Sequence, residues 1–295
     1  MRVGIVDVGA NTVRLLVATR ERDRLVAVRE DRVQLGLGDE IARTGSISTE
    51  KVDEAADTAA AHVRRARKLR CAAIEVLVTS PGRQAQNGGE LVARLSESTG
   101  ALSRVLSAEE EGELAWHGAV AAARELPDPV AVCDVGGGSA QIVVGTLYSG
   151  PGWVRSVDIG SLRLTRRAFQ NDPPSSSDLG EAARAIDAAF GELSPPFALA
   201  ALAVGGTARA LRRIAGDELD GDALADALDR LRRTDSRQIA KEFRIDRNRA
   251  RTVTAGAMIL SEIQKRLGVP LEVGRGGIRE GAALMLLDAT AAATG

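Results

Sequence analysis

Two short segments of the chain carry residue types that bind phosphate, in nearly the same order. The first reads Asp7-Val8-Gly9-Ala10-Asn11-Thr12-Val13-Arg14-Leu15, and the second reads Asp134-Val135-Gly136-Gly137-Gly138-Ser139-Ala140-Gln141-Ile142. Glycine lets backbone N–H groups approach an anion closely, and the hydroxyl residue adds a donor. Because β-branched residues follow each turn, we predict the second strand of a hairpin and not the helix of a dinucleotide-binding or P-loop turn.

Duplication is what makes this pattern informative. A single Asp-x-Gly hairpin is usually an ordinary turn, but here the same pattern occurs at the start of the chain and again in its middle. The strand-end aspartates, Asp7 and Asp134, could hold a cation or a water molecule against a bound anion. Two such hairpins that face one another would form a two-sided phosphate clamp.

Three further segments place polar residues at the ends of predicted strands. Ser107-Ala108-Glu109-Glu110-Glu111 opens a helix, in which Ser107 and Glu110 fit a capping box while Glu111 is not needed for the cap. Arg83 follows a strand at the sheet edge where ligands bind, and its forked donors suit a phosphate, although a solvated arginine fits equally well. Gly205-Gly206-Thr207 precedes a helix whose N-terminus could hold an anion.

Several enzyme classes are excluded by what the sequence lacks. It contains no GxxxxGK[ST], HExxH or GxSxG motif, and its two histidines, His62 and His117, fall within predicted helices. The chemistry must therefore come from carboxylates, arginines, hydroxyls and backbone amides, which suits the handling of phosphate with a divalent metal.

The amino-acid composition indicates which binding partners the protein can have and in which cellular compartment it is expected. The net charge of −1 gives no global basic field, so we expect no nucleic-acid partner. Cys71 and Cys133 lie alone in apolar sequence and are expected to be reduced core residues of a cytoplasmic protein. We recognise neither a signal peptide nor an apolar run of transmembrane length, and expect no membrane association.

The order of predicted elements indicates an α/β fold with two similar domains, residues 1–126 and 127–295. Pro127-Asp128-Pro129 interrupts the chain just before the second aspartate hairpin. Each half reads as three antiparallel strands followed by strand–helix units. The predicted helices cover residues 48–69, 84–98, 108–124, 179–193, 209–214, 221–233, 247–267 and 279–292. The final helix could pack back across the domain boundary.

Taken together, these segments closely resemble the exopolyphosphatase / guanosine pentaphosphate phosphatase family, within the actin-like, sugar-kinase and heat-shock ATPase superfamily. The resemblance extends from Val3 to Gly281. It is carried by the two aspartate hairpins, the Glu111 segment and three more matches: Thr79-Ser80-Pro81-Gly82-Arg83-Gln84-Ala85-Gln86-Asn87, Gly205-Gly206-Thr207-Ala208-Arg209 and Ile278-Arg279-Glu280-Gly281. Six matches in family order are far more specific than any one of them.

The resemblance implies two ribonuclease-H-like domains with mixed sheets flanked by helices, an interdomain cleft, and hydrolysis of a terminal phosphate with Mg²⁺ or Mn²⁺. Carried over by motif, Glu111 is the general base, Arg83 neutralises charge, and Asp7 and Asp134 position the metal or water, so that Glu111, Asp134 and Arg83 are the catalytic set. The phosphate-binding set is Gly9, Asn11, Thr12, Arg14, Gly136, Gly137, Gly138, Ser139, Gly206 and Thr207.

Two departures from the family pattern stand out. The family usually carries a glutamate two residues after the serine of the second hairpin, where this chain has Gln141. Gln141 is therefore expected to be at most a weak, indirect metal-site residue, with lower metal affinity, altered metal choice or lower activity. Longer members append an HD-type helical domain, whereas this chain resembles the short, two-domain members.

The expected substrate is inorganic polyphosphate, with guanosine pentaphosphate as the close alternative. Arg163, Arg166, Arg167 and Arg209 could form a basic track for either polyanion, although a solvated face explains them equally well. A binding protein or sensor that lost turnover through Gln141, and a kinase of the same superfamily, are the other readings. The sequence leaves open whether the protein is a monomer or a homodimer.

Overall fold

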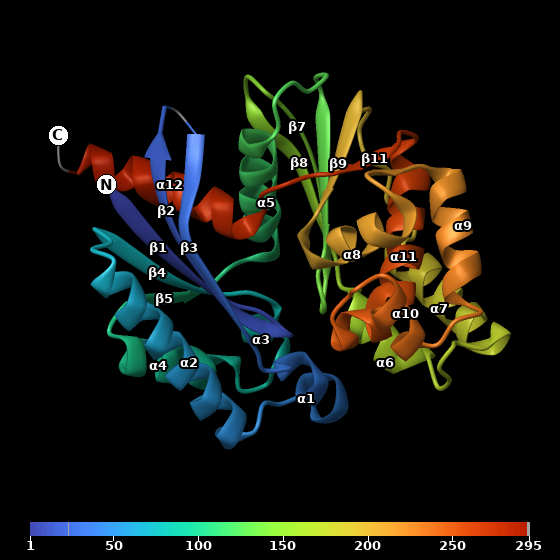
Figure 1. The fold of residues 1–295 in the computed structure, drawn as a ribbon, viewed down its shortest axis with the longest axis horizontal. Coiled ribbons are helices and arrows are strands. Elements are labelled where there is room, and N and C mark those ends of the chain that lie inside the picture. The colour runs from blue at the N-terminus through green and yellow to red at the C-terminus, as the bar shows by residue number, and fades with distance from the viewer. Residues whose placement is uncertain (23, 294–295) are drawn as a thin grey trace. The chain divides into compact units, whose positions relative to one another are not determined.

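The computed structural model describes residues 1–22 and 24–293. These divide into two compact units: unit 1 comprises Met1–Ala122 together with the segment from Gly276 onward, and unit 2 comprises Ala123–Arg275. Each unit has its own sheet and its own helices (Figure 1).

Unit 1 is built on a five-stranded mixed sheet in the order β3-β2-β1-β4-β5. Its strands are β1 (Arg2–Val8), β2 (Thr12–Glu21), β3 (Arg24–Gln34), β4 (Ala73–Val78) and β5 (Leu102–Val105). β1, β2 and β3 form two antiparallel hairpins, whereas β4 pairs parallel to β1 and β5 pairs parallel to β4. The carboxyl ends of β1, β4 and β5 therefore lie at one edge of the sheet.

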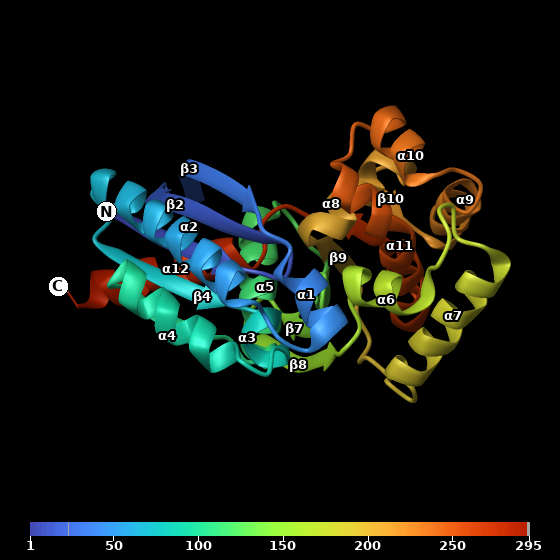
Figure 2. The ribbon, with the colours of Figure 1, turned by 90° about the horizontal axis from the view of Figure 1, so that it is seen from below.

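Alternate side chains of β1 enter two different cores, as the two-residue period of a strand requires. Val6 and Val8 pack with α2 (Thr49–Lys68) and α4 (Gly88–Thr99) on one face. Val3 and Ile5 pack with α5 (Ala108–Ala122) and α12 (Ile278–Ala292) on the other. Figures 1 and 2 show α2 and α4 side by side against the sheet. Two short helices, α1 (Leu37–Thr44) and α3 (Ser80–Gln84), follow β3 and β4.

Unit 2 has a six-stranded sheet in the order β10-β11-β9-β6-β7-β8. Its strands are β6 (Val130–Val135), β7 (Ala140–Thr146), β8 (Gly150–Val157), β9 (Ala200–Val204), β10 (Glu218–Leu219) and β11 (Leu271–Val273). β6, β7 and β8 are antiparallel, and β9 and β11 run parallel to β6. Both units therefore begin with three antiparallel strands and continue with parallel ones, apart from the two-residue β10, which pairs antiparallel to β11. This order confirms the predicted ribonuclease-H-like α/β class.

One continuous core joins this sheet to the helices of unit 2. They are α6 (Ser161–Ala168), α7 (Ser176–Phe190), α8 (Gly205–Ala215), α9 (Gly221–Leu231), α10 (Ser236–Glu242) and α11 (Arg247–Leu267). The side chains of Ser175, Asp220, Asp235 and Asp246 accept backbone N–H bonds at the starts of α7, α9, α10 and α11. These caps satisfy N–H groups that the helices themselves leave unpaired.

The last helix packs with unit 1, whereas the domain limits drawn from the sequence put residues 276–295 in the second half. Glycines make this packing possible where α12 crosses α5. A Cβ on Gly118 would lie 2.1 Å from the carbonyl oxygen of Gly277, and one on Gly281 would lie 2.0 Å from that of Leu114. Since neither position has room for a side chain, the two helix backbones lie in direct contact.

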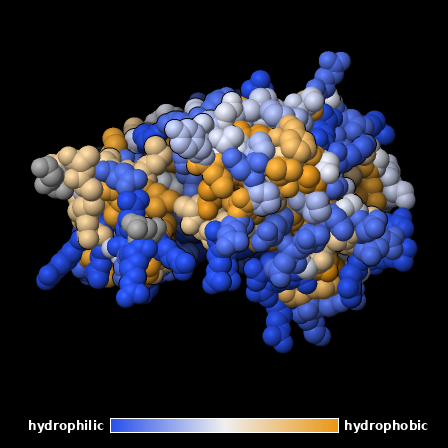
Figure 3. Space-filling model, turned by 90° about the horizontal axis from the view of Figure 1, so that it is seen from above, coloured by the Kyte–Doolittle hydropathy of each residue, from blue (hydrophilic) through white to orange (hydrophobic). Residues whose placement is uncertain are grey.

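Hydrophilic side chains cover most of the face shown in Figure 3, and apolar side chains gather there in smaller patches. Among the residues that the structure describes, we find no helix with the length and apolar character needed to cross a membrane.

Candidate active site

The carboxyl edge of the unit 1 sheet brings three predicted segments together. The first hairpin closes where the Gly9 N–H donates to the carbonyl oxygen of Thr12 at 3.0 Å, next to the end of β1. Thr79, at the end of β4, donates its N–H to Val8 at 3.1 Å. β5 ends beside β4, and α5 starts two residues after Leu106. Parallel strands thus position the glycine turn, the Arg83 segment and the Glu111 segment along one edge.

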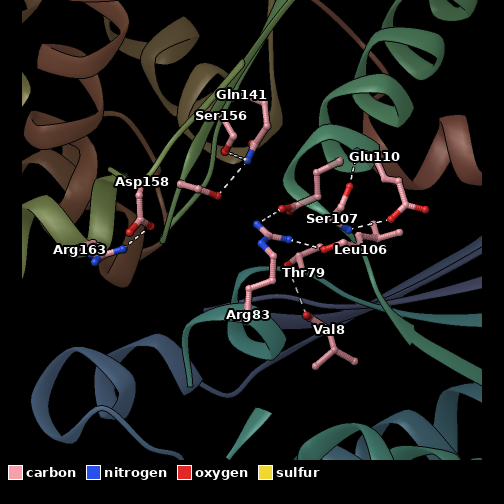
Figure 4. A network of polar contacts seen from close by, with 12 residues as sticks. Val8, Thr79, Arg83, Leu106, Ser107, Glu110, Gln141, Ser156, Asp158 and Arg163 are labelled. Atoms are coloured by element: carbon pink, nitrogen blue, oxygen red, sulfur yellow. Dashed lines mark hydrogen bonds and ion pairs between the residues drawn. The ribbon is translucent and has the colours of Figure 1, made fainter. Parts of the chain in front are cut away.

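Arg83 and Glu111 form an ion pair at this edge. The Arg83 Nη2 atom donates to Glu111 Oε2, and Nη1 donates to the carbonyl oxygen of Leu106 at 2.7 Å. Figure 4 shows the guanidinium of Arg83 directed toward Leu106. Glu111 is only 4% exposed, so its carboxylate is held by the fork of the arginine in a largely desolvated position.

The neighbouring acid, Glu110, has the structural role that the sequence predicted. Ser107 and Glu110 form the capping box: the Ser107 N–H donates to Glu110 Oε2 at 2.8 Å, and the Glu110 N–H donates to Ser107 Oγ at 3.0 Å. The backbone N–H of Ser107, together with the Arg104 guanidinium, lowers the pKa of Glu110 below its ordinary value. The two adjacent glutamates of α5 thus have different roles: Glu110 caps the helix, and Glu111 binds Arg83.

Asp7 lies opposite Arg14 in the register of the first hairpin. Desolvation raises the pKa of Asp7, and the positive charges of Arg14 and Arg279 partly offset that rise. Arg279 stands at the start of α12 with a side chain 11% exposed, 3.5 Å from both Glu30 and Glu280. Arg279 and Glu280 were matched to the family without a predicted role; the structure places their charges around Asp7.

The second hairpin repeats the turn of the first. The Gly136 N–H donates to the carbonyl oxygen of Ser139 at 2.9 Å, which is the bond that Gly9 makes to Thr12. The start of α6 holds the outer side of this loop, because the Ser161 N–H donates to Gly136 at 2.9 Å. The duplicated sequence pattern is therefore a duplicated backbone geometry.

Asp134 lies at the carboxyl end of β6, against the turn after β9. A Cβ on Gly205 would lie 2.1 Å from Asp134 Oδ1, and Gly205 has a φ of +84°. Both the close approach and the left-handed backbone favour glycine. The turn after β9 therefore packs directly against the Asp134 carboxylate.

Thr207 has a role different from the predicted phosphate contact. Its fully buried hydroxyl donates to the carbonyl oxygen of Val135 at 2.7 Å, so this proton ties the β9–α8 turn to the end of β6. Arg249 of α11, which the sequence analysis missed, lies 3.4 Å from Thr207 Oγ1 and packs against Gly206. The cation at this turn is thus supplied from a helix more than forty residues further along the chain.

Gln141 lies opposite Asp134 in the register of the second hairpin and is 3% exposed. Its Nε2 atom donates to Ser139 Oγ at 2.9 Å and to Ser156 Oγ at 3.2 Å (Figure 4). The side chain is therefore a neutral donor to two serine hydroxyls.

The donor set does not form a protein-only metal centre. The described residues contain no group of three or more His, Cys, Asp or Glu side chains placed to hold a metal ion. In unit 2 the carboxylate of Asp134 stands opposite the amide of Gln141. Mg²⁺ commonly takes one or two carboxylates and completes its shell with water and substrate phosphates, so these residues fit a cation carried mainly by substrate.

The arginines of the suggested basic track do not share one environment. Arg163 pairs with Asp158, and Arg167 lies exposed on α6. Arg166 lines a cavity of about 330 Å³ between α6, α10 and α11, together with Arg251, which was not part of the suggested track. Arg209 is exposed on α8. These arginines therefore lie partly on the exposed surface and partly in a cavity, and this distribution does not favour a single continuous basic track.

A model of the Ppx/GppA phosphatase family matches residues 16–290. The chain belongs to the Ppx/GppA phosphatase family. It is 28% identical over 318 aligned positions to Exopolyphosphatase 1 of Mycobacterium tuberculosis, covering 100% of the chain and 90% of that relative. It is also 28% identical to Exopolyphosphatase 2 of the same organism, covering 97% and 98%. As a Ppx/GppA family member, the protein is a phosphohydrolase.

Solved structures of the Ppx/GppA family have the same fold as this chain. The Aquifex aeolicus family member superposes with a TM-score of 0.84 at 24% identity, covering 98% of both chains. An exopolyphosphatase from Cytophaga hutchinsonii superposes with a TM-score of 0.86 at 22% identity, also covering 98% of both. At these identities the likeness supports the fold of both units.

Proposed function

We propose that this protein releases the terminal phosphate of inorganic polyphosphate by water attack, with Glu111 as the general base. The decisive observation is the Arg83–Glu111 ion pair, whose carboxylate is buried and which lies on the same sheet edge as the glycine turn of the first hairpin. Family membership supports a phosphohydrolase, and the two exopolyphosphatase relatives favour polyphosphate as the substrate.

In this mechanism the backbone N–H groups of the Gly9–Thr12 turn and the guanidinium of Arg83 bind phosphate oxygens. Glu111 accepts a proton from the attacking water as its oxygen bonds to the terminal phosphorus. The bridging P–O bond breaks, and the shortened chain leaves with the electron pair. Arg83, already bonded to Glu111, orients the carboxylate and balances charge that builds on the equatorial oxygens.

The hairpin of unit 2 supplies the same kinds of donor. The backbone amides from Gly136 to Ser139 are proposed to bind other phosphate groups of the polyphosphate. Arg249 is proposed to add positive charge at the neighbouring turn. A Mg²⁺ or Mn²⁺ ion that enters with the polyphosphate would neutralise charge on the phosphate oxygens.

Phosphate release tests this proposal directly. Purified protein is incubated in parallel with long polyphosphate, short polyphosphate and guanosine pentaphosphate, each with Mg²⁺ or Mn²⁺. We expect the fastest release from polyphosphate. Faster release from guanosine pentaphosphate would assign the protein to the nucleotide substrate, and binding without release from any of the three would favour a sensor.

A further inference from the structure

The two hairpins share a side-chain hydrogen bond in addition to their backbone turn. In the first, Arg14 Nε donates to Thr12 Oγ1 at 3.2 Å. In the second, Gln141 Nε2 donates to Ser139 Oγ at 2.9 Å. In both cases the donor lies two residues after the hydroxyl, on the same side of the strand. The hydroxyl residue of each turn is therefore an acceptor toward its own hairpin.

This bond fixes what the hydroxyl can offer to a ligand. A hydroxyl has one proton and two lone pairs, and the N–H from the hairpin occupies a lone pair. A guanidinium has no acceptor atom, and an amide nitrogen does not accept, so neither Arg14 Nε nor Gln141 Nε2 can take the hydroxyl proton. The proton of Ser139 is thus left for another acceptor.

A second serine holds the orientation of Gln141. The same Nε2 atom donates to Ser156 Oγ on β8 at 3.2 Å, within a site where Gln141 is nearly inaccessible to solvent. Both amide protons are directed at serine oxygens, so in this orientation Gln141 acts toward both hydroxyls as a donor.

We propose that Gln141 is a positioning residue that sets the Ser139 hydroxyl as a donor to a phosphate oxygen, so that the 136–139 loop grips a phosphate chain without a resident cation. The inference rests on the proposed function, because it takes phosphate as the ligand of this loop. A glutamate at position 141 would act in the opposite sense: ionised, it only accepts, so it would take the Ser139 proton and add a negative charge beside Asp134. Gln141 thus makes the 136–139 loop a direct anion-binding site where a glutamate would make it a cation site.

A double-mutant cycle measured by calorimetry tests the proposal, with imidodiphosphate in EDTA as a hydrolysis-resistant probe. Ser139→Ala should weaken binding on the order of ten- to a hundredfold, as expected for a lost hydrogen bond to a charged group. Gln141→Glu should weaken it at least as much. In the Gln141→Glu protein, adding Ser139→Ala should change binding by less than about twofold, because Ser139 no longer donates to the ligand. Equal effects of Ser139→Ala in both backgrounds would overturn the proposal.

Metal binding gives a readout that a merely structural role of Gln141 would not move. Titration of the free protein with Mn²⁺, followed by electron paramagnetic resonance, should show no stoichiometric site, whereas the Gln141→Glu variant should gain one. A tight Mn²⁺ site in the unaltered protein, or none gained in the variant, contradicts the inference.

Two controls separate the possible failures. Ser156→Ala removes one of the two bonds that orient the Gln141 amide, so it should weaken probe binding, but by less than Ser139→Ala does. If Gln141→Glu does not fold, Gln141→Leu replaces it in the cycle: it cannot donate or accept, so it should weaken probe binding without creating a Mn²⁺ site. If the unaltered protein binds neither imidodiphosphate nor polyphosphate, the proposed function is refuted. If the Gln141 variants bind the probe as well as the unaltered protein does, only this inference is refuted.

Discussion

The hairpins of the two units have the same backbone turn but different charges around it. In unit 1 the aspartate at the strand end, Asp7, stands opposite Arg14 with Arg279 nearby. In unit 2 the equivalent aspartate, Asp134, stands opposite the neutral Gln141. A turn of this kind thus fixes where backbone N–H groups point, while the residue two positions after the hydroxyl sets the electrostatics.

The comparison extends to the groups that could perform chemistry. Unit 1 has the ion pair of Arg83 and Glu111 at its sheet edge. At the corresponding edge of unit 2, the Asp134 carboxylate packs against Gly205 and the Arg249 guanidinium packs against Gly206. In the proposed mechanism unit 1 supplies proton transfer as well as phosphate contacts, whereas unit 2 supplies phosphate contacts alone. Substitutions in the two units should therefore affect different parameters.

The largest expected effect comes from Glu111→Gln. This change keeps the shape of the side chain but removes its ability to accept a proton, so kcat should fall on the order of 10²–10⁴-fold. KM should change little, because phosphate binding does not depend on that proton. Steady-state kinetics with polyphosphate measures both. A variant with nearly full kcat would show that proton transfer does not depend on this residue of unit 1.

Gly205→Ala should produce the largest loss of stability in unit 2. An alanine there would adopt a φ of +84° and place its Cβ 2.1 Å from Asp134 Oδ1. Left-handed backbone and overpacking together should cost about 2–5 kcal/mol in the free energy of unfolding, measured by urea denaturation. Gly216→Ala is the matched control, since Gly216 also has a positive φ but nothing within 4 Å of its Cβ position. Equal losses in the two variants would show that contact with Asp134 adds nothing.

The sequence predicted the elements with a local signature. The aspartate hairpins, the capping box of α5 and the full extent of α11 follow from patterns within a few residues of each feature. The short helices α1, α6 and α10 were missed. α1 and α6 each begin after a glycine without a side-chain cap, whereas α10 begins at the Asp235 cap but is only seven residues long.

Features created by distant segments could not be predicted in this way. Residues 84–98 were expected to form one helix, but Asn87 instead bonds the backbone of Ile47, and α3 ends before α4 begins. The cation of Arg249 reaches Gly206 only through the packing of α11 against α8. A lone arginine on a helix has no local pattern that distinguishes this role from a solvated one.

A mildly acidic pH should weaken unit 1, because the buried His62 lies in it. His62 is buried, its Nε2 atom has no hydrogen-bond partner, and desolvation lowers its pKa below the ordinary 6.5. At His62 the unfolded chain then binds more protons than the folded one, so the contribution of His62 to stability is fully present above about pH 6.5 and is lost as the pH falls below it. Thermal melts across this range should show a smaller acid-induced fall in Tm for His62→Leu. An identical fall in both proteins would show that His62 does not contribute.

Glu110→Gln is expected to have the smallest effect and is the natural partner of Glu111→Gln on the same helix. Glutamine can keep one acceptor for the N–H of Ser107, but it cannot also pair with Arg104, so the free energy of unfolding should fall by about 1 kcal/mol or less near pH 7. Because the pKa of Glu110 is lowered in the folded protein, its contribution is present above the ordinary value of 4.5 and disappears as the pH falls through the lowered one. Urea denaturation at neutral and strongly acidic pH should therefore show a deficit that vanishes in acid, while kcat stays near that of the unaltered protein. A large loss of kcat in Glu110→Gln, with Glu111→Gln nearly active, would transfer the role of the base to Glu110.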